Sequence, residues 1–182
     1  NDSKLCEKCK RPSCLHPTVC KNLNTDHSHL LELYNLVRRD THVKHCFVGS
    51  GIRYDLIMHR TGNKETDSIN REYLETVIKH HVSGRFKVAP EHSSDNVLHL
   101  MRKPSFKLFH ELTARFNAIN KQEHLNQQII PYFISSHPGC SLVDMAQLAI
   151  DTKELNFRLE QVQDFTPTPM TLATDMYYSG LH

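Results

Sequence analysis

Short apolar segments alternate with helical segments along most of the chain, and this alternation limits the fold more than any other feature. Apolar runs of strand length occur at residues 44–51, 84–90, 127–136 and 158–165. Apolar residues at helical spacing predict helices over 25–39, 69–82, 94–103, 105–122, 141–155 and 168–180. Strands that alternate with helices in this way are typical of βα units and a parallel sheet. The sequence therefore predicts an α/β fold with about four parallel βα units.

The segments that follow the predicted strands are candidates for a ligand site. Four βα units are half of an eight-stranded barrel or most of an open doubly wound sheet, and both architectures bind ligands beyond the carboxyl ends of their strands. These segments read GSGIR (49–53), PEHSSD (90–95), SSHPG (135–139) and TPTPM (166–170). Glycine, proline and serine suit turns and helix caps, whereas Arg53, Glu91, His92 and His137 are not needed for turning the chain. Two interpretations stay open: turn chemistry alone, or a ligand site lined by at least two of the loops.

Composition and charge restrict the class of protein. The chain has 182 residues, of which 38% are hydrophobic and 23% charged, as expected for a soluble globular protein. No apolar run approaches the ~20 residues of a membrane span, so we expect no membrane contact. Six cysteines in a chain of this size are too sparse for a disulfide scaffold, so we expect a cytoplasmic protein. The net charge of +2 is too small to indicate nucleic-acid binding. The chain starts at Asn1, so we expect a processed chain or part of a longer one.

The first 24 residues contain four of the six cysteines, in the stretch CEKCKRPSCLHPTVC (6–20). Two prolines and the lack of any period predict an irregular segment, so we divide the chain into a cysteine-rich part (1–24) and an α/β part (25–182). Cys6, Cys9, Cys14 and Cys20 offer the four thiolates that zinc or an auxiliary iron–sulfur cluster needs. Flanking basic residues would offset their negative charge. Free, packed thiols and disulfides are the alternatives, and disulfides are rare in a reducing cytosol.

Several long stretches resemble a known family. KVAPEHSSDNVLHLMRKPSF, IPYFISSHPGCSLVDMAQLA and LEQVQDFTPTPMTLATDMYYSG are similar to the C-terminal half of a YgiQ-like radical S-adenosylmethionine (SAM) protein, as are CKRPSCLHPTVCKNLNTDH and GSGIRYDL. The resemblance covers nearly the whole chain and, more loosely, extends to methylthiotransferase-type enzymes. It implies a partial (β/α)6 TIM-like barrel in which these strands are the third to the sixth and SAM lies across the strand ends.

The resemblance also implies roles for individual residues. Glu91 stands where the related enzymes have Gln or Glu, and Ser93 and Ser94 stand in the loop that contacts the ribose of SAM. Arg102 matches an arginine that pairs with the SAM carboxylate, a task suited to the guanidinium fork. The remaining implied SAM contacts are His137, Pro138, Gly139, Phe165 and Pro167. Glu91 or His92 is a candidate for proton transfer, and Arg53 is a candidate substrate contact or half of an ordinary ion pair.

The chain departs from the family pattern at the cluster. It contains no C-x3-C-x2-C triad to bind a [4Fe–4S] cluster and no Gly-Gly-Glu stretch to bind the methionyl amine. In the family both lie before the matched segment, so this chain alone is expected to be inactive. The full-length protein would bind SAM and the cluster, take an electron from a donor, and form a 5′-deoxyadenosyl radical that acts on an unknown substrate. Cys140 stands where relatives have Glu or Thr, and we assign it to local packing or capping.

Two other functions were weighed. A metal-binding α/β module could bind RNA or a protein partner, but residues 1–24 contain no aromatic residue to stack on bases. A phosphate-binding barrel hydrolase lacks a glycine-rich loop and a nucleophile–base pair. An exposed edge strand would need covering, either by a second copy in a homo-oligomer or by the N-terminal segment. Five further histidines are expected on helix or loop surfaces: His80, His81, His99, His110 and His124.

Overall fold

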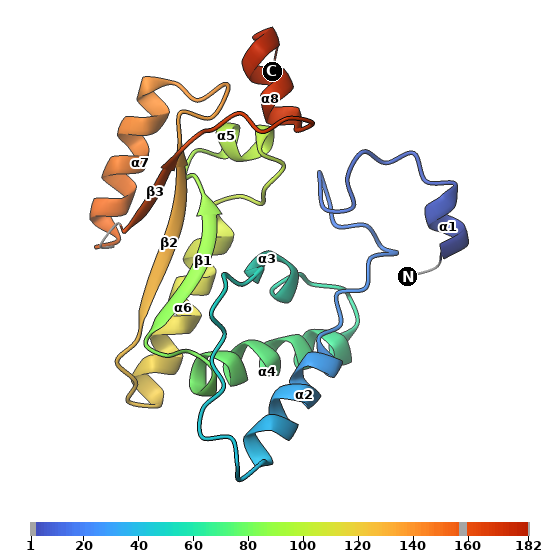
Figure 1. The fold of residues 1–182 in the computed structure, drawn as a ribbon, viewed down its shortest axis with the longest axis vertical. Helices are drawn as coiled ribbons and strands as arrows, with labels where there is room; N and C mark the ends of the chain where they lie inside the picture. Colours follow the sequence, from blue (N-terminus) through green and yellow to red (C-terminus); the bar gives the residue numbers. More distant parts are fainter. Residues whose placement is uncertain (1–2, 157–159, 182) are drawn as a thin grey trace. The chain divides into compact units, whose positions relative to one another are not determined.

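The computed structural model describes residues 3–156 and 160–181, drawn as a ribbon in Figure 1. The chain divides into two compact units. The first comprises Asn1–Phe86 and Leu112–Gln128, and the second comprises Lys87–Glu111 and Ile129–His182. Each unit is described separately below. The division predicted at residue 24 stays a prediction.

The first unit is helical. Its helices are α1 (Ser3–Glu7), α2 (Ser28–Arg39), α3 (Tyr54–Ile57) and α4 (Lys64–His80), together with the last turns of α6 (Lys107–Gln122). Helices α2 and α3 both pack against α4. The inner face of α4 includes Tyr73, Val77 and Ile78 at helical spacing. Phe86 and Phe116 are also buried in this unit and stack with ring centroids 5.4 Å apart.

Residues 44–51 do not form the strand that the sequence predicts. The Val48 N–H donates to the carbonyl of His81 over 2.8 Å, and the His81 ring Nδ1–H donates to the carbonyl of Cys46 over 2.7 Å. The backbone of this segment therefore pairs with the end of α4 instead of a neighbouring strand. His81 is only 1% exposed, so its expected surface position was wrong. The other four histidines expected on the surface are exposed: His80, His99, His110 and His124.

The second unit contains a small parallel sheet with helices around it (Figure 1). Its strands, β1 (Arg85–Glu91), β2 (Gln128–Ser135) and β3 (Gln161–Asp164), lie in the order β1-β2-β3. Strand β3 runs parallel to β2 with Ser135 opposite Asp164. The helices of this unit are α5 (Asp95–Leu100), the start of α6, α7 (Leu142–Glu154) and α8 (Leu172–Ser179).

Alternating burial along the strands explains where the core of this unit lies. In β1, every second residue from Phe86 to Pro90 is buried, and β2 is buried at Phe133 and Ser135. Phe106, from the segment before α6, packs on Phe133 with ring centroids 6.4 Å apart. The predicted parallel α/β class is thus confirmed. The described residues contain three strands, however, so the arrangement with four βα units is not confirmed.

Two further expectations concern the N-terminal segment and membrane spans. The segment predicted to be irregular contains one short helix, α1, which buries no residue. Within the described residues, no helix combines the length and apolar character needed to cross a bilayer.

Candidate functional site

The carboxyl ends of β2 and β3 bring two of the predicted loops together in the second unit. The Ser135 hydroxyl donates to the Asp164 carboxylate directly across the sheet. One residue further on, the Phe165 N–H donates to the carbonyl of Ser135 over 2.9 Å. The loops after β2 and β3 therefore start side by side, as parallel strands require.

Three non-glycine residues have left-handed backbone conformations in the last residue of β1 and in the loops that follow β2 and β3. Glu91 has a φ of 70°, Ser136 of 58° and Met170 of 67°. Such conformations cost about 1–3 kcal/mol each and concentrate at functional sites. Gly139, predicted as a SAM contact, has a φ of 81°, which glycine adopts freely. Among the described residues, Arg102, His124 and Asn156 are left-handed as well, so this conformation occurs at the strand ends but is not confined to them.

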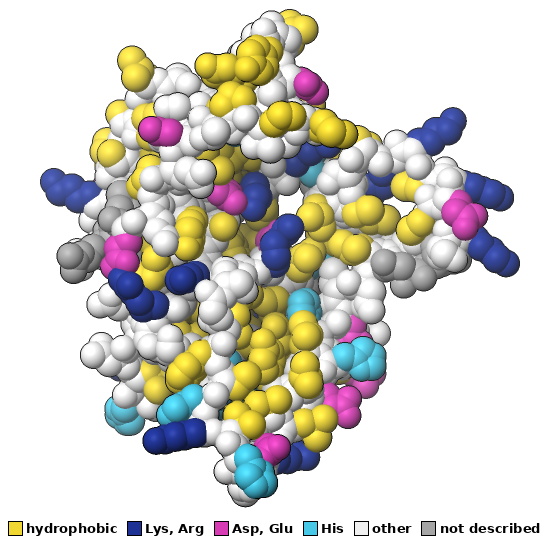
Figure 2. Space-filling view, in the orientation of Figure 1, with side chains coloured by type: hydrophobic (Ala, Val, Ile, Leu, Met, Phe, Trp, Pro, Cys, Tyr) yellow, Lys and Arg dark blue, Asp and Glu magenta, His cyan; other side chains and the backbone are white. Residues whose placement is uncertain are grey.

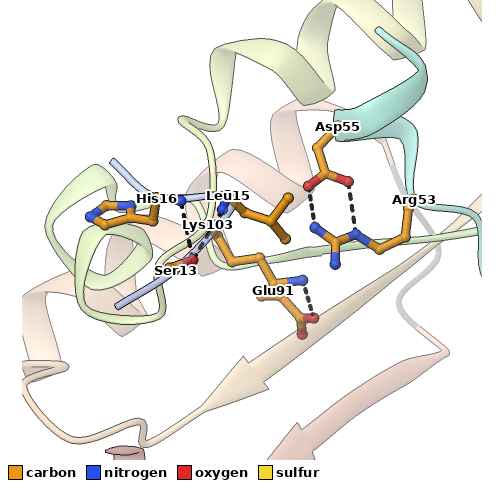
Figure 3. Close-up of polar contacts among 7 residues, drawn as sticks. All are labelled: Ser13, Leu15, His16, Arg53, Asp55, Glu91 and Lys103. Atoms are coloured by element: carbon orange, nitrogen blue, oxygen red, sulfur yellow. Dashed lines mark hydrogen bonds and ion pairs between the residues drawn. The ribbon is translucent and has the colours of Figure 1, made fainter. Parts of the chain in front are cut away.

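Glu91 ends β1 and forms an ion pair with Lys103, whose Nζ lies 3.0 Å from Oε1 of Glu91 (Figure 3). Both side chains are largely buried. The preceding residue, Arg102, has a left-handed φ of 55° and an exposed side chain. Lys103, which the sequence analysis did not select, is therefore the basic group that contacts Glu91.

His92 is fully buried and connects two loops. Its Nδ1 accepts the N–H of Ser94 over 2.9 Å, so this nitrogen carries no proton in that arrangement. Its Nε2 lies 3.5 Å from the sulfur of Cys140, to which the Nε2–H donates. Burial lowers the pKa of His92 and raises the pKa of Cys140. Both shifts favour the neutral imidazole of His92 and the neutral thiol of Cys140. A neutral pair suits a structural contact better than a nucleophile–base pair.

The N-terminus of α7 provides a second connection between the same loops. Ser141 and Asp144 form a capping box, in which each side chain bonds to the other residue's backbone N–H. Asp144 also accepts a hydrogen bond from Ser94. The bonds from Ser141 and then Ser94 lower the pKa of Asp144 to about 2. The loop after β1 and the turn after β2 are thus joined at two places.

Aromatic rings cluster after β3. The buried ring of His137 contacts the edge of Phe165 at a centroid distance of 5.5 Å, and Phe165 contacts Tyr177 at 5.8 Å. His137 Nδ1–H donates to the carbonyl of Pro138 over 2.8 Å, and burial lowers the pKa of its imidazole. Pro138 and Pro167 are half-buried. This loop can offer an apolar surface to a flat ring.

One hydroxyl in the loop after β1 has no partner. The Ser93 Oγ is buried and makes no hydrogen bond in the structure. A buried hydroxyl left unpaired is costly, so such an atom needs an explanation. A ligand that bonds to Ser93 would supply one. The neighbouring Ser94 caps α5 without a side-chain hydrogen bond to it.

The remaining predicted residues lie in the first unit. Arg53 forms a two-bonded ion pair with Asp55, with its Nε 3.0 Å from Oδ1 (Figure 3). This arrangement matches the ordinary ion pair that the sequence analysis left open, and the substrate role stays a prediction. The four N-terminal cysteines line one open pocket, with residues His59, Arg60 and Thr61 from the loop after α3. Among the described residues, no group of three or more His, Cys, Asp or Glu side chains is placed to bind a metal ion.

Sequence reasoning missed two residues of this site, Lys103 and Asp144. Lys103 follows the arginine of LMRK directly, so a shift of one position would have found it. Asp144 could have been found from the S-x-x-D spacing of a capping box. Cys140 was assigned to packing, which fits its contact with His92, but no local pattern indicates that partner.

Comparison with known proteins gives close relatives. The chain is 59% identical over its whole length to a protein of Porphyromonas gingivalis strain W83 and 58% identical to one of Bacteroides thetaiotaomicron. A protein of Methanocella arvoryzae is 48% identical over 94% of the chain. These relatives are UPF0313 proteins. The chain spans only 27–29% of their length. No family model and no solved structure matches the chain.

Proposed function

We propose that this chain forms the SAM-binding part of a radical SAM enzyme. The observation that carries the proposal is the placement of the predicted contacts in the second unit. Glu91 ends β1, most of the other contacts lie on the loops that follow the three strands, and the buried hydroxyl of Ser93 is unpaired. The resemblance noted from the sequence supplies the identity of the ligand. We further propose that β1, β2 and β3 are strands of a partial (β/α)6 barrel.

The residues of the site fit the groups that SAM presents. The buried Ser93 hydroxyl and the Glu91 carboxylate can hydrogen-bond to ribose hydroxyls. Arg102, exposed beside this loop, can pair with the SAM carboxylate. The edge contact between His137 and Phe165, with half-buried Pro167, offers apolar surface for adenine. Lys103 holds the Glu91 carboxylate in place through their ion pair.

In this proposal, the ligands of the [4Fe–4S] cluster belong to another part of the full-length protein. SAM bound to a reduced [4Fe–4S] cluster would supply a 5′-deoxyadenosyl radical for hydrogen abstraction. The UPF0313 relatives are more than three times as long as the matched segment, which leaves room for the cluster ligands and for contacts with an electron donor. The contribution of this chain is to bind and orient SAM. The substrate is not specified by the residues described.

Anaerobic SAM cleavage tests the proposal. The full-length protein is loaded with iron and sulfide, reduced with dithionite, and assayed for 5′-deoxyadenosine by mass spectrometry. We expect product from the loaded protein and weaker SAM binding in Ser93→Ala and Arg102→Ala. Loss of one charged contact typically weakens binding by about tenfold or more.

Arg115→Ala provides a matched control because Arg115 is also an exposed arginine, on α6 and outside the loops of the site. Its SAM affinity should equal that of the unmodified protein. A protein with a demonstrably loaded cluster that neither binds nor cleaves SAM would rule out the proposed activity. Equal affinity in Arg102→Ala and Arg115→Ala would remove Arg102 from the site.

A further inference from the structure

The cysteine segment, residues 3–24, has no hydrophobic core of its own. None of its residues is buried, and Leu5 in α1 is 62% exposed. A segment that buries so little apolar surface cannot offset the conformational entropy lost on ordering. Small coreless elements are usually ordered by disulfides or by a metal. All six cysteines lack a disulfide in the structure, and a bound metal would order this segment.

The four thiols of the segment already face a common space. Cys6, Cys9, Cys14 and Cys20 all line one open pocket of about 1220 Å³. Two backbone hydrogen bonds fold the chain so that they do: Cys9 N–H donates to the carbonyl of Cys6 over 3.1 Å, and Cys20 N–H donates to that of Cys14 over 2.7 Å. Each bond thus closes a loop between two of the cysteines.

Two of the sulfurs accept N–H hydrogen bonds. Asn22 Nδ2 lies 3.1 Å from the sulfur of Cys6, and the backbone N of Arg11 lies 3.5 Å from the sulfur of Cys9. A neutral thiol is a weak acceptor, whereas a metal-bound thiolate is charged and is oriented by donors of this kind. These contacts are independent of the cysteine spacing and would orient the two sulfurs in a metal site.

The charge of the segment favours the same assignment. Residues 1–22 contain five basic residues against two acidic ones, and Figure 2 shows Lys and Arg side chains along this segment. The guanidinium of Arg11 is fixed by bonds to the carbonyls of Ser13 and Thr18. Arg60 lines the pocket from the loop after α3. Four thiolates around a divalent cation carry a net charge of −2, which these cations would offset.

We propose that the cysteine segment is a structural zinc site with Cys6, Cys9, Cys14 and Cys20 as its ligands. Because no three of the thiols converge in the described structure, binding must draw them together until each sulfur lies about 2.3 Å from the metal. Zinc is favoured over an iron–sulfur cluster because the segment lacks a core, and zinc sites supply folding energy to such elements. The assignment does not depend on SAM binding.

Metal analysis of the full chain tests the proposal. The chain is purified after expression with added Zn²⁺ and its metal content measured by mass spectrometry. We expect about one zinc per chain, and less than a fifth of that in the double variants Cys6→Ser/Cys9→Ser and Cys14→Ser/Cys20→Ser. Cys46→Ser is the matched control, since Cys46 is a free cysteine outside the segment, and it should retain the zinc.

A second measurement covers the case in which a variant fails to fold. Removal of zinc from the unmodified chain by a chelator should increase hydrogen exchange in residues 3–24, and added Zn²⁺ should reverse the change. Zinc content that is unaffected by the double variants, or exchange that is unaffected by the chelator, would overturn the site. Iron and sulfide lost in the same variants, in place of zinc, would overturn the choice of metal. Both results are independent of SAM cleavage.

Discussion

Acid should open the loop after β1, because unprotonated His92 stabilises this loop through a hydrogen bond. Protonation of the His92 ring would break that bond. The Nδ1 of His92 accepts the N–H of Ser94, so a proton on Nδ1 would place two donors against each other. Burial lowers the pKa of His92 in the closed loop, and His137 lowers it further, while Asp144 and Asp151 of α7 act in the opposite direction. The remaining contact of the ring is the sulfur of Cys140.

The sign and size of the pH effect follow from the coupling between proton binding at His92 and opening of the loop. The open loop exposes His92 to water and restores its ordinary pKa of about 6.5, so the open state binds more protons than the closed one. The closed loop is therefore fully favoured above about pH 6.5 and is lost as the pH falls toward the lowered pKa. Within that window the open population rises by up to about tenfold per pH unit, or about 1.4 kcal/mol.

Hydrogen exchange measured by mass spectrometry reports this opening. Protection of the peptide that contains Ser94 is measured in the full chain from about pH 7.5 to about pH 5, corrected for the intrinsic pH dependence of exchange. We expect protection to fall in the unmodified chain. His92→Asn should keep protection constant across this range, because an Asn oxygen can accept an N–H two residues on but does not titrate.

His110→Asn is the control, since His110 is an exposed histidine of the same unit, and it should keep the full pH dependence. Constant protection in the unmodified chain would refute the argument. So would an identical fall in His92→Asn, because the titrating group would then be another residue.

Two further predictions concern stability. Asn70→Ala removes a buried amide that donates to the carbonyl of Thr25 and accepts the N–H of His27, so unfolding by urea should show a loss of about 1–3 kcal/mol; an unchanged midpoint would contradict this role. Ser141→Ala breaks the capping box of α7 and should cost about 1 kcal/mol. The same change should raise the pKa of Asp144 from about 2 toward its usual range, and an NMR titration that finds it unmoved would exclude Ser141 as the main cause.

Much of the fold follows from local patterns. The helices from α4 to α8 and the strands β1, β2 and β3 lie within or close to the predicted ranges, because their apolar residues recur at the periods of helix and strand. The loops that carry Glu91, His92, Ser93 and His137 were placed correctly after strands for the same reason. Local sequence thus determined which residues lie near the ends of the strands.

Tertiary structure decided which partners those residues meet. Residues 44–51 have the composition of a strand, but a ladder needs a neighbour, and the end of α4 takes their hydrogen bonds instead. Lys103, not Arg102, contacts Glu91, and the backbone at Arg102 between α5 and Lys103 is left-handed. His92 and Cys140 are 48 residues apart in sequence. Sequence periodicity fixes which side of an element is apolar, but contacts between distant loops depend on packing that no local pattern encodes.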